Sequence, residues 1–242
     1  MKKKILIIGG RGLLGSNFIL NNYEHYKEII NIDIVENKKL QKINNHKFIE
    51  LDLSINHNIS QQFQSILKKY KNIEYFVNCS YITNKEYSKS NFNQIDYDNF
   101  VSNLNYNLTT YTWTAKLVLD YMKKYNRGSV VLLNSIYGIL GQDMSLYKNT
   151  NIRENFTYSV AKGGITNAVK QLASFYGKYN IRVNSICSGG VVGHVKSSQK
   201  SQPKNFILNY SIKCPLGRLA KPNEITDVIK FLCSDNSSYI TG

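Results

Sequence analysis

The chain has 242 residues, of which 42% are hydrophobic, enough for the core of one α/β domain and too many for a disordered chain. Its net charge of +15 raises nucleic acid as a partner. The lysines are spread along the sequence without a nucleic-acid motif, so we expect no specific nucleic-acid binding.

The lengths of the apolar segments and the spacing of the cysteines indicate where the protein is located and whether it binds a membrane or a metal. After a lysine-rich start, the apolar run 5–8 stops at Gly9, which is too short for a secretory signal, and no run is long enough to span a bilayer. The four cysteines are scattered, with no Cys-x-x-Cys pair and no Cys/His cluster. We therefore expect a cytoplasmic protein with reduced thiols, no membrane contact and no metal site.

The first predicted element is a buried strand over residues 4–8, followed at once by a glycine-rich turn and a helical segment. Glycines 10, 12 and 15 fit G-x-G-x-x-G, and glycines 9, 12 and 15 fit G-x-x-G-x-x-G. Such a turn lets the backbone and the helix N-terminus approach a pyrophosphate. A glycine-rich turn without a ligand is the alternative, but the strand-turn-helix context favours dinucleotide binding.

The second predicted strand, residues 28–33, ends in an acidic residue. Asp33 lies 18 residues after Gly15 (33 − 15), close to the spacing of the carboxylate that binds an adenosine ribose. A carboxylate there repels a 2′-phosphate, which favours NAD over NADP, whereas Arg11 argues mildly for NADP. A solvated Asp at a strand end is the alternative interpretation.

Strands and helices alternate along the rest of the chain. This alternation predicts a Rossmann-type, doubly wound parallel α/β sheet with helices on both faces, forming a single domain over residues 1–242. The further predicted strands are 48–53, 74–80, 128–135 and 180–186, and the helices are 58–70, 97–123 with one break, and one from before residue 158 to about 176.

The most informative pair is Tyr158 and Lys162, which lie four residues apart and therefore on one face of a helix. A neighbouring positive charge favours an ionised phenol, so Tyr158 could exchange a proton with a substrate hydroxyl near neutral pH. In a chain rich in Tyr and Lys this spacing also arises by chance, so its meaning depends on the surrounding motifs.

In this order, the motifs resemble those of the short-chain dehydrogenase/reductase family. The similarity runs nearly end to end and includes the segments 182–184, 215–218 and 231–242. The resemblance implies that Tyr158 is the catalytic acid/base, and that Lys162 lowers the pKa of Tyr158 and holds the nicotinamide ribose. It also implies that the Ser135 hydroxyl forms a hydrogen bond with the reacting oxygen, and that Asn107 holds a water molecule on a proton relay. Taken alone, Ser135 could be a turn residue and Asn107 a helix cap. The implied cofactor contacts are Gly9, Arg11, Gly12, Leu13, Leu14, Gly15, Asp33, Asp52, Leu53, Asn78, Cys79, Ser80, Tyr158, Lys162, Ser188, Gly189 and Val191.

The sequence also departs from the family pattern. The interval from Ser135 to Tyr158 is 23 residues (158 − 135), longer than is usual in the family, and we expect the extra segment 141–156 to cover the substrate pocket. Its polar and basic residues suggest a hydrophilic or anionic substrate, and a similar insertion occurs in members from bacterial surface-sugar and flagellin-glycan pathways. Tyr81 replaces a usual glycine and is expected to crowd the nicotinamide, and Ser188 replaces a usual proline.

Two further regions differ or carry less information. Residues 194–204 lie where the family has its mobile substrate loop, and a solvated loop is the simpler interpretation. The sequence stops at Gly242, where the family continues into one more strand, so we expect either a truncated chain lacking its final strand or an open sheet edge.

These observations predict an NAD(P)-dependent oxidoreductase that interconverts a secondary alcohol and a ketone on a polar small molecule. A sugar or sugar nucleotide is favoured as substrate, NAD as cofactor, and a homo-oligomer, dimer or tetramer, as the assembly usual in the family. The alternative is a nucleotide-binding regulator or scaffold that keeps the fold without turnover.

Overall fold

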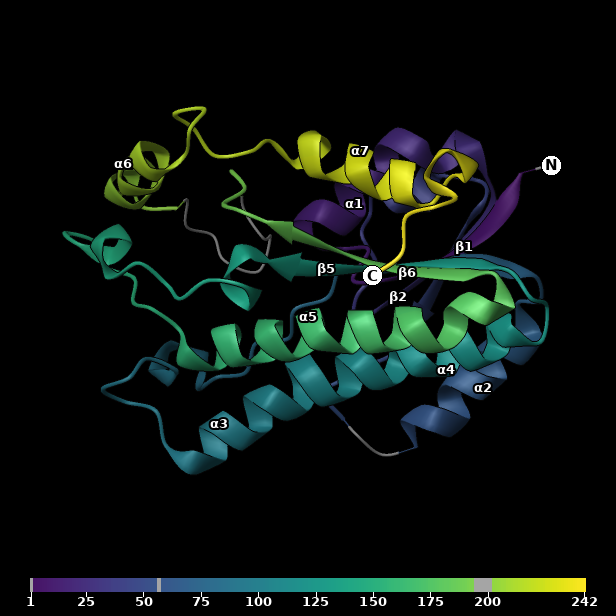
Figure 1. Cartoon of the computed structure of the whole chain (residues 1–242), viewed down its shortest axis with the longest axis horizontal. Coiled ribbons are helices and arrows are strands. Elements are labelled where there is room, and N and C mark those ends of the chain that lie inside the picture. Colours follow the sequence, from purple (N-terminus) through teal and green to yellow (C-terminus); the bar gives the residue numbers. More distant parts are fainter. Residues whose placement is uncertain (1, 56–57, 194–201) are drawn as a thin grey trace.

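The computed structural model describes residues 2–55, 58–193 and 202–242, and its centre is a six-stranded parallel sheet (Figure 1). The strand order is β3-β2-β1-β4-β5-β6. The chain first adds strands on one side of β1 and then, from β4 on, on the other side, as in doubly wound folds. The predicted Rossmann-type, single-domain α/β class is confirmed. The strands are β1 (Lys3–Ile8), β2 (Tyr26–Asp33), β3 (His46–Glu50), β4 (Ile73–Asn78), β5 (Gly128–Ser135) and β6 (Ile181–Ser188).

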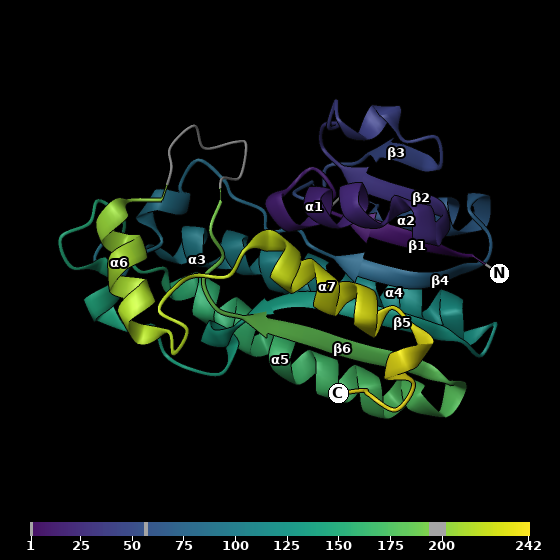
Figure 2. The same cartoon turned by 90° about the horizontal axis from the view of Figure 1, so that it is seen from above.

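Helices cover both faces of the sheet (Figure 2). On one face lie α1 (Leu13–Asn22) and α7 (Pro222–Leu232), and on the other lie α2 (Ile59–Lys69), α4 (Tyr111–Lys123) and α5 (Phe156–Tyr176). The short helices α3 (Tyr97–Leu104) and α6 (Lys204–Lys213) lie beyond the carboxyl ends of the strands, where they flank the region that holds the candidate site (Figure 1). No helix among the described residues is long and apolar enough to cross a membrane.

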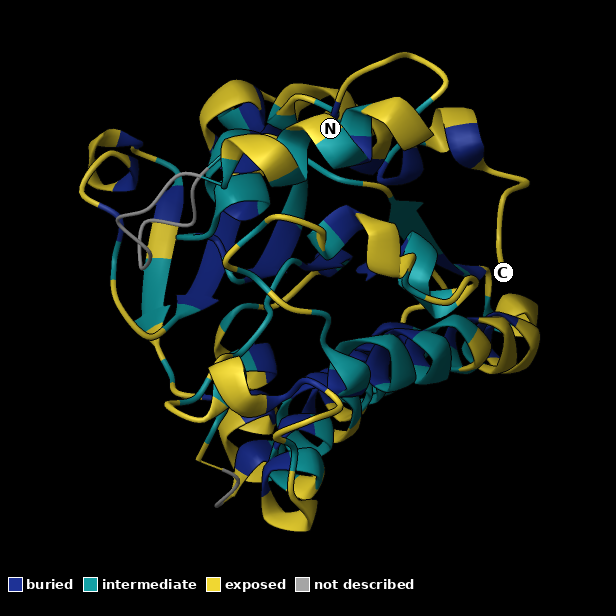
Figure 3. Ribbon diagram, turned by 90° about the vertical axis from the view of Figure 1, so that its left-hand side faces the viewer, coloured by how far each residue is buried: buried dark blue, intermediate teal, exposed yellow. Residues whose placement is uncertain are grey.

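The two-sided cover explains why the strands read as apolar runs. In β1, Ile5 and Ile7 pack against the α1 and α7 side, whereas Leu6 and Ile8 pack against the α2, α4 and α5 side. Successive side chains of a strand point to opposite faces, so both sets are buried only when both faces are covered. The central strands are accordingly buried, and the exposed residues of the helices lie on the sides that face away from the sheet (Figure 3).

The predicted long helix over residues 97–123 forms, and its predicted break is a change of helix type. After α3 the backbone makes a π-helical segment, Asn105–Thr110, and continues directly into α4. Such segments place an extra residue in the turn and are frequent at functional sites. Asn107, one of the predicted catalytic residues, is buried in this segment.

Element ends differ from prediction by a few residues, with one consequence for the site. The third strand ends at Glu50, so Asp52 and Leu53 lie in the loop that follows it and not in the strand. At the opposite edge of the sheet, the Gly242 N–H donates to the Val183 carbonyl (2.9 Å), beside β6.

Candidate active site

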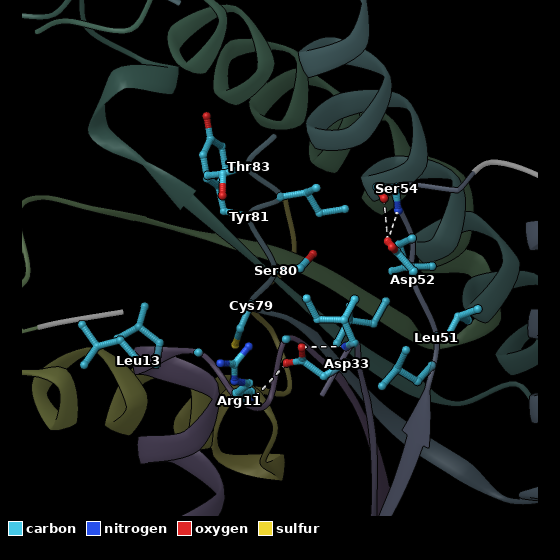
Figure 4. A pocket seen from close by; sticks show the side chains of 18 of the residues that line it. Arg11, Leu13, Asp33, Leu51, Asp52, Ser54, Cys79, Ser80, Tyr81 and Thr83 are labelled. Carbon is cyan, nitrogen blue, oxygen red and sulfur yellow. Dashed lines mark hydrogen bonds between the residues drawn. The ribbon is translucent and has the colours of Figure 1, made fainter. Parts of the chain in front are cut away.

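A pocket of about 500 Å³ opens at the carboxyl ends of β1, β2 and β4, where the strand order reverses (Figure 4). This is the position at which open α/β sheets bind ligands. Eleven of the predicted cofactor residues line it, namely Gly9, Arg11, Gly12, Leu13, Leu14, Asp33, Asp52, Leu53, Cys79, Ser80 and Val191. Sequence reasoning did not assign Ile34, Ser54, Ile82 and Thr83, which also line it and carry no motif that would have revealed them.

At two positions of the glycine loop, the backbone accommodates only glycine. Gly9 has a φ of +80°, a region that other residues rarely adopt. A Cβ atom on Gly15 would lie 2.2 Å from the Gly9 carbonyl oxygen, so a side chain there would force the helix away from the loop. The loop closes on itself through Gly12 N–H to Gly9 O (3.1 Å). Gly15 is therefore buried beneath the loop and does not line the pocket.

Two side chains of β2 hold successive amides of this loop. Asn31 Oδ1 accepts from the Gly10 N–H (3.0 Å), and Asp33 Oδ2 accepts from the Arg11 N–H (2.9 Å). Asp33 Oδ1 accepts in addition from Ile34 N–H (2.8 Å), so its carboxylate is fixed at the pocket wall. Sequence reasoning did not single out Asn31, because its complete burial and its contact with Gly10 are visible only in the structure.

Polar side chains also shape the turns after β3 and β4. Asp52 lines the pocket, and its Oδ1 accepts from the Ser54 backbone N–H (2.8 Å) and hydroxyl (2.6 Å) (Figure 4). Asn78 Oδ1 accepts in the same way from the Ser80 N–H (3.0 Å) and hydroxyl (2.7 Å). Asn78 is completely buried and supports the turn from behind the pocket lining.

Asn107 is bound to the same pocket wall through its side-chain amide. Its Oδ1 accepts from the Ile82 N–H (2.8 Å), and its Nδ2 donates to the Ile82 carbonyl (2.9 Å). The π-helical segment thus clamps the loop after β4 in the way a neighbouring strand would.

The structure brings together Tyr158, Ser135 and Lys162 at the ends of β5 and α5. The Ser135 hydroxyl accepts from the Tyr137 N–H (3.2 Å) and lies close enough to the Tyr158 hydroxyl to lower its pKa. The buried Lys162 ammonium donates to the Leu133 carbonyl (2.8 Å) and lies 5.6 Å from the centroid of the Tyr158 ring. The Asn155 side chain accepts from the Tyr158 N–H (2.8 Å) and caps α5, which fixes where the helix begins.

Burial dominates the titration of this pair. It raises the pKa of Tyr158 to about 12, because desolvation outweighs the lowering by the Ser135 hydroxyl. Burial also lowers the pKa of Lys162 to about 8, since a charged amine is disfavoured away from water. The expected lowering of the Tyr158 pKa by Lys162 therefore stays a prediction, since burial of the phenol dominates its pKa here.

Ser188 and Gly189, the remaining predicted cofactor contacts, do not line the pocket. Ser188 is paired in register with Ser135 across β5 and β6, and Gly189 approaches the Tyr210 hydroxyl, from which a Cβ would be 3.5 Å away. Tyr81 lines the pocket and places its ring edge-on against Tyr158, with centroids 5.1 Å apart.

The insertion 141–156 packs against α6. Leu146 is buried with Tyr210 of α6, and the Asn209 side chain donates to the Leu146 and Lys148 carbonyls (3.1 and 2.9 Å). The basic residues Lys148 and Arg153 are exposed. Of the predicted substrate loop 194–204, residues 194–201 lie outside the described residues.

Comparison with known proteins agrees with this geometry. A family model described as Enoyl-(Acyl carrier protein) reductase matches residues 28–242. The chain is 27% identical to post-translational flagellin modification protein A of Campylobacter coli, over 99% of this chain and 94% of that protein. It is 33% identical to the 3-oxoacyl-acyl-carrier-protein reductase FabG of Chlamydia trachomatis, over 81% of this chain and 72% of that one.

Solved structures give the same result. A short-chain dehydrogenase from Leptospira borgpetersenii with bound NAD+ matches with a TM-score of 0.86 and 27% identity, over 100% of this chain and 89% of that one. At 20% identity and a TM-score of 0.80, the structure of ElxO with NADP bound shares the fold.

A parallel sheet with a glycine loop at its switch point and a Tyr/Lys/Ser group beside it defines an NAD(P)-dependent oxidoreductase. The chain belongs to the short-chain dehydrogenase/reductase family.

Proposed function

We propose that Tyr158, Lys162, Ser135 and Asn107 are the catalytic residues of a reaction that interconverts a secondary alcohol and a ketone. The observation that carries this proposal is the placement of the buried Lys162 amine 5.6 Å from the centre of the Tyr158 ring, with the Ser135 hydroxyl close enough to lower the pKa of the phenol. A nicotinamide cofactor, when bound, accepts hydride from the alcohol carbon or donates it to the ketone carbon.

The protein groups handle the proton and the oxygen. In oxidation, the Tyr158 phenolate takes the hydroxyl proton as the carbon gives up hydride, and in reduction the phenol returns it. The Ser135 hydroxyl stabilises charge on the reacting oxygen. Asn107, through its two bonds to Ile82, positions the loop after β4 that lines the cofactor pocket and contacts Tyr158 through Tyr81.

NAD is the cofactor that this pocket favours. The Gly9 and Gly15 backbone geometry fits a bound pyrophosphate, because no side chain intrudes where it would approach. The Asp33 carboxylate, fixed by two backbone amides, suits a ribose diol and would repel a 2′-phosphate. Arg11 lines the same pocket and is the residue that would favour NADP.

A sugar or sugar nucleotide is the substrate class we favour. The support is the polar insertion before Tyr158 together with the similarity to a flagellin modification protein over nearly the whole chain.

The test replaces Tyr158 with Phe in a screen of sugars and nucleotide sugars, with NAD and NADP side by side. We expect turnover to be lost in Tyr158→Phe while the NADH dissociation constant, measured by fluorescence, stays within about threefold. Substantial turnover by the variant contradicts the catalytic assignment. A strong NADP preference of the unchanged protein contradicts the weight given to Asp33.

A further inference from the structure

Five tyrosines from four separate segments surround Tyr158. Two of them contact its ring edge-on: Tyr81 at 5.1 Å and Tyr137 at 6.4 Å between centroids. Of the other three, Tyr87 packs edge-on against Tyr81 with centroids 5.8 Å apart, and Tyr147 and Tyr210 pack in one apolar cluster with Tyr137. We call this set the tyrosine cluster: Tyr81 and Tyr87 after β4, Tyr137 after β5, Tyr147 in the insertion, and Tyr210 in α6.

The hydroxyls of the tyrosine cluster are uncharged. Burial raises the pKa of each of the five above its ordinary value, so none is ionised near neutral pH. Each can therefore both donate and accept a hydrogen bond. Lys162 is the buried cation beside the cluster, and its ammonium is already bonded to the Leu133 carbonyl.

The insertion contributes an aromatic residue to this cluster and keeps its cations outside. The Tyr147 hydroxyl donates to Gln142 Oε1 (2.6 Å). Gln142 Nε2 donates in turn to the Ser159 hydroxyl (2.7 Å), one residue after Tyr158. Lys148 and Arg153, in contrast, are exposed. The expected recognition of an anionic group by the insertion therefore finds no support next to Tyr158.

The tyrosine cluster favours one chemical type of substrate group beside Tyr158. Aromatic faces bury the apolar face of a ring, and phenol hydroxyls pair with its hydroxyls. Among the described residues, the cation beside the cluster is Lys162, which already donates to the Leu133 carbonyl and is itself buried. A carboxylate or phosphate placed there would lose water with only this partly engaged cation to compensate, which is costly. A site built to bond hydroxyls also discriminates strongly against groups that leave those bonds unmade.

We propose that the substrate presents an uncharged, hydroxyl-bearing ring to Tyr158, and that Tyr137 and Tyr147 are the residues that select it. This inference rests on the proposed oxidoreductase function and narrows its substrate class. Any anionic part of the substrate lies away from the tyrosine cluster. Tyr147 acts in selection together with Gln142, which fixes its hydroxyl relative to α5.

The test uses two nucleotide sugars that differ in the charge of the sugar ring. UDP-N-acetylglucosamine carries a neutral ring and UDP-glucuronic acid a carboxylate on the same nucleoside diphosphate, and acetoacetyl-coenzyme A provides an acyclic ketone. We expect kcat/KM at least about tenfold higher for the neutral ring. Tyr147→Phe should lower this ratio, and Tyr147→Arg should shift it toward the carboxylate, each with an unchanged NADH dissociation constant.

The control is Tyr239→Phe, since Tyr239 is fully exposed and should leave the ratio unchanged. An equal loss for both sugars in Tyr147→Phe, or a preference for UDP-glucuronic acid, overturns the inference. If the protein turns over only acetoacetyl-coenzyme A, and Tyr158→Phe abolishes this turnover, the inference about the substrate ring is overturned. The proposed oxidoreductase function then still holds. Absence of any Tyr158-dependent turnover of the three overturns both proposals.

Discussion

At the scale of single residues, the contact between Gly10 and Asn31 shows how β2 sets the shape of the cofactor loop. Asn31 is fully buried, and its Oδ1 accepts from the Gly10 N–H (3.0 Å). A Cβ on Gly10 would lie 2.2 Å from Asn31 Oδ1, far inside van der Waals contact. Glycine is required at position 10 because of this neighbour and not because of its φ angle.

We therefore expect Gly10→Ala to lower the free energy of unfolding by about 1–3 kcal/mol, the usual cost of overpacking, and to weaken NADH binding. Urea unfolding and NADH fluorescence measure the two effects. Gly141→Ala is the matched control, because a Cβ there meets nothing within 4 Å. In Gly10→Ala/Asn31→Ala the added methyl gains room, so the double variant should lose less than the sum of the single losses. If the losses of unfolding free energy in the two single variants simply add in the double variant, the proposed contact between Gly10 and Asn31 is contradicted.

Lys162, which we propose as a catalytic residue, lowers the stability of the folded chain when its amine is charged. Burial lowers its pKa from 10.5 to about 8, so folding is penalised wherever the amine is charged. Between these two pKa values the unfolded chain binds the proton and the folded chain does not, so stability rises with pH in this window. Below pH 8 the full penalty applies, and it amounts to about 3 kcal/mol for a shift of this size.

Lys162→Met should therefore stabilise the protein at pH 7 and less so at pH 9.5. The Leu133 carbonyl still accepts from the Tyr111 hydroxyl (3.0 Å), so the substitution leaves no buried acceptor without a partner. Urea unfolding of both proteins at the two pH values measures the difference. Equal stabilisation at both pH values, or destabilisation at pH 7, contradicts a penalty from the charged amine.

At the scale of elements, the π-helical segment Asn105–Thr110 connects the long helix to the pocket wall. Asn107 supplies a donor and an acceptor to Ile82, whose backbone lies in a loop without a neighbouring strand. Asn107→Leu would leave both Ile82 groups unpaired, at a cost of about 1–3 kcal/mol for each group that stays buried. We expect lower stability and NADH binding weakened by about tenfold.

Unfolding and NADH titration test this variant against Asn167→Leu, an exposed position on α5 with the same chemical change. Asn107→Asp keeps the acceptor for Ile82 N–H and should weaken NADH binding less than Asn107→Leu does. An Asn107→Leu protein that binds NADH normally would show that the clamp does not position the pocket wall.

Local patterns predicted most elements, because their signals are contained within short stretches of sequence. The apolar run of β5 and the glycine turn after β1 are examples, since each depends on neighbouring residues only. The π-helical segment and the Asn31 contact depend on groups that are distant in sequence, Ile82 and Gly10 respectively, and no local pattern contains them. The same holds for the tyrosine cluster, whose members come from four segments, and for the pKa of Tyr158, which burial determines.

At the scale of the whole molecule, the charge of +15 predicts attraction to any polyanion without defining a binding site. Several cations are engaged in ion pairs, for example Lys4 with Glu28 (2.9 Å) and Arg218 with Glu224 (2.6 Å). The pocket that fits a ligand is lined by two carboxylates, Asp33 and Asp52, against one guanidinium, Arg11. The net charge and the binding site are therefore separate features.

We accordingly expect binding to duplex DNA to be weak and steeply salt-dependent, because it would arise from released counterions alone. A protein contacting six or more phosphates loses about a thousandfold in affinity or more between 50 and 200 mM salt, whereas NADH, with two phosphates, should lose only a few-fold. Fluorescence anisotropy with two unrelated DNA sequences and NADH titration, each at both salt concentrations, measure this. NADH should not displace the DNA. Sequence-selective binding that persists at 200 mM salt, or competition between NADH and DNA, would show that a nucleic-acid site overlaps the cofactor pocket.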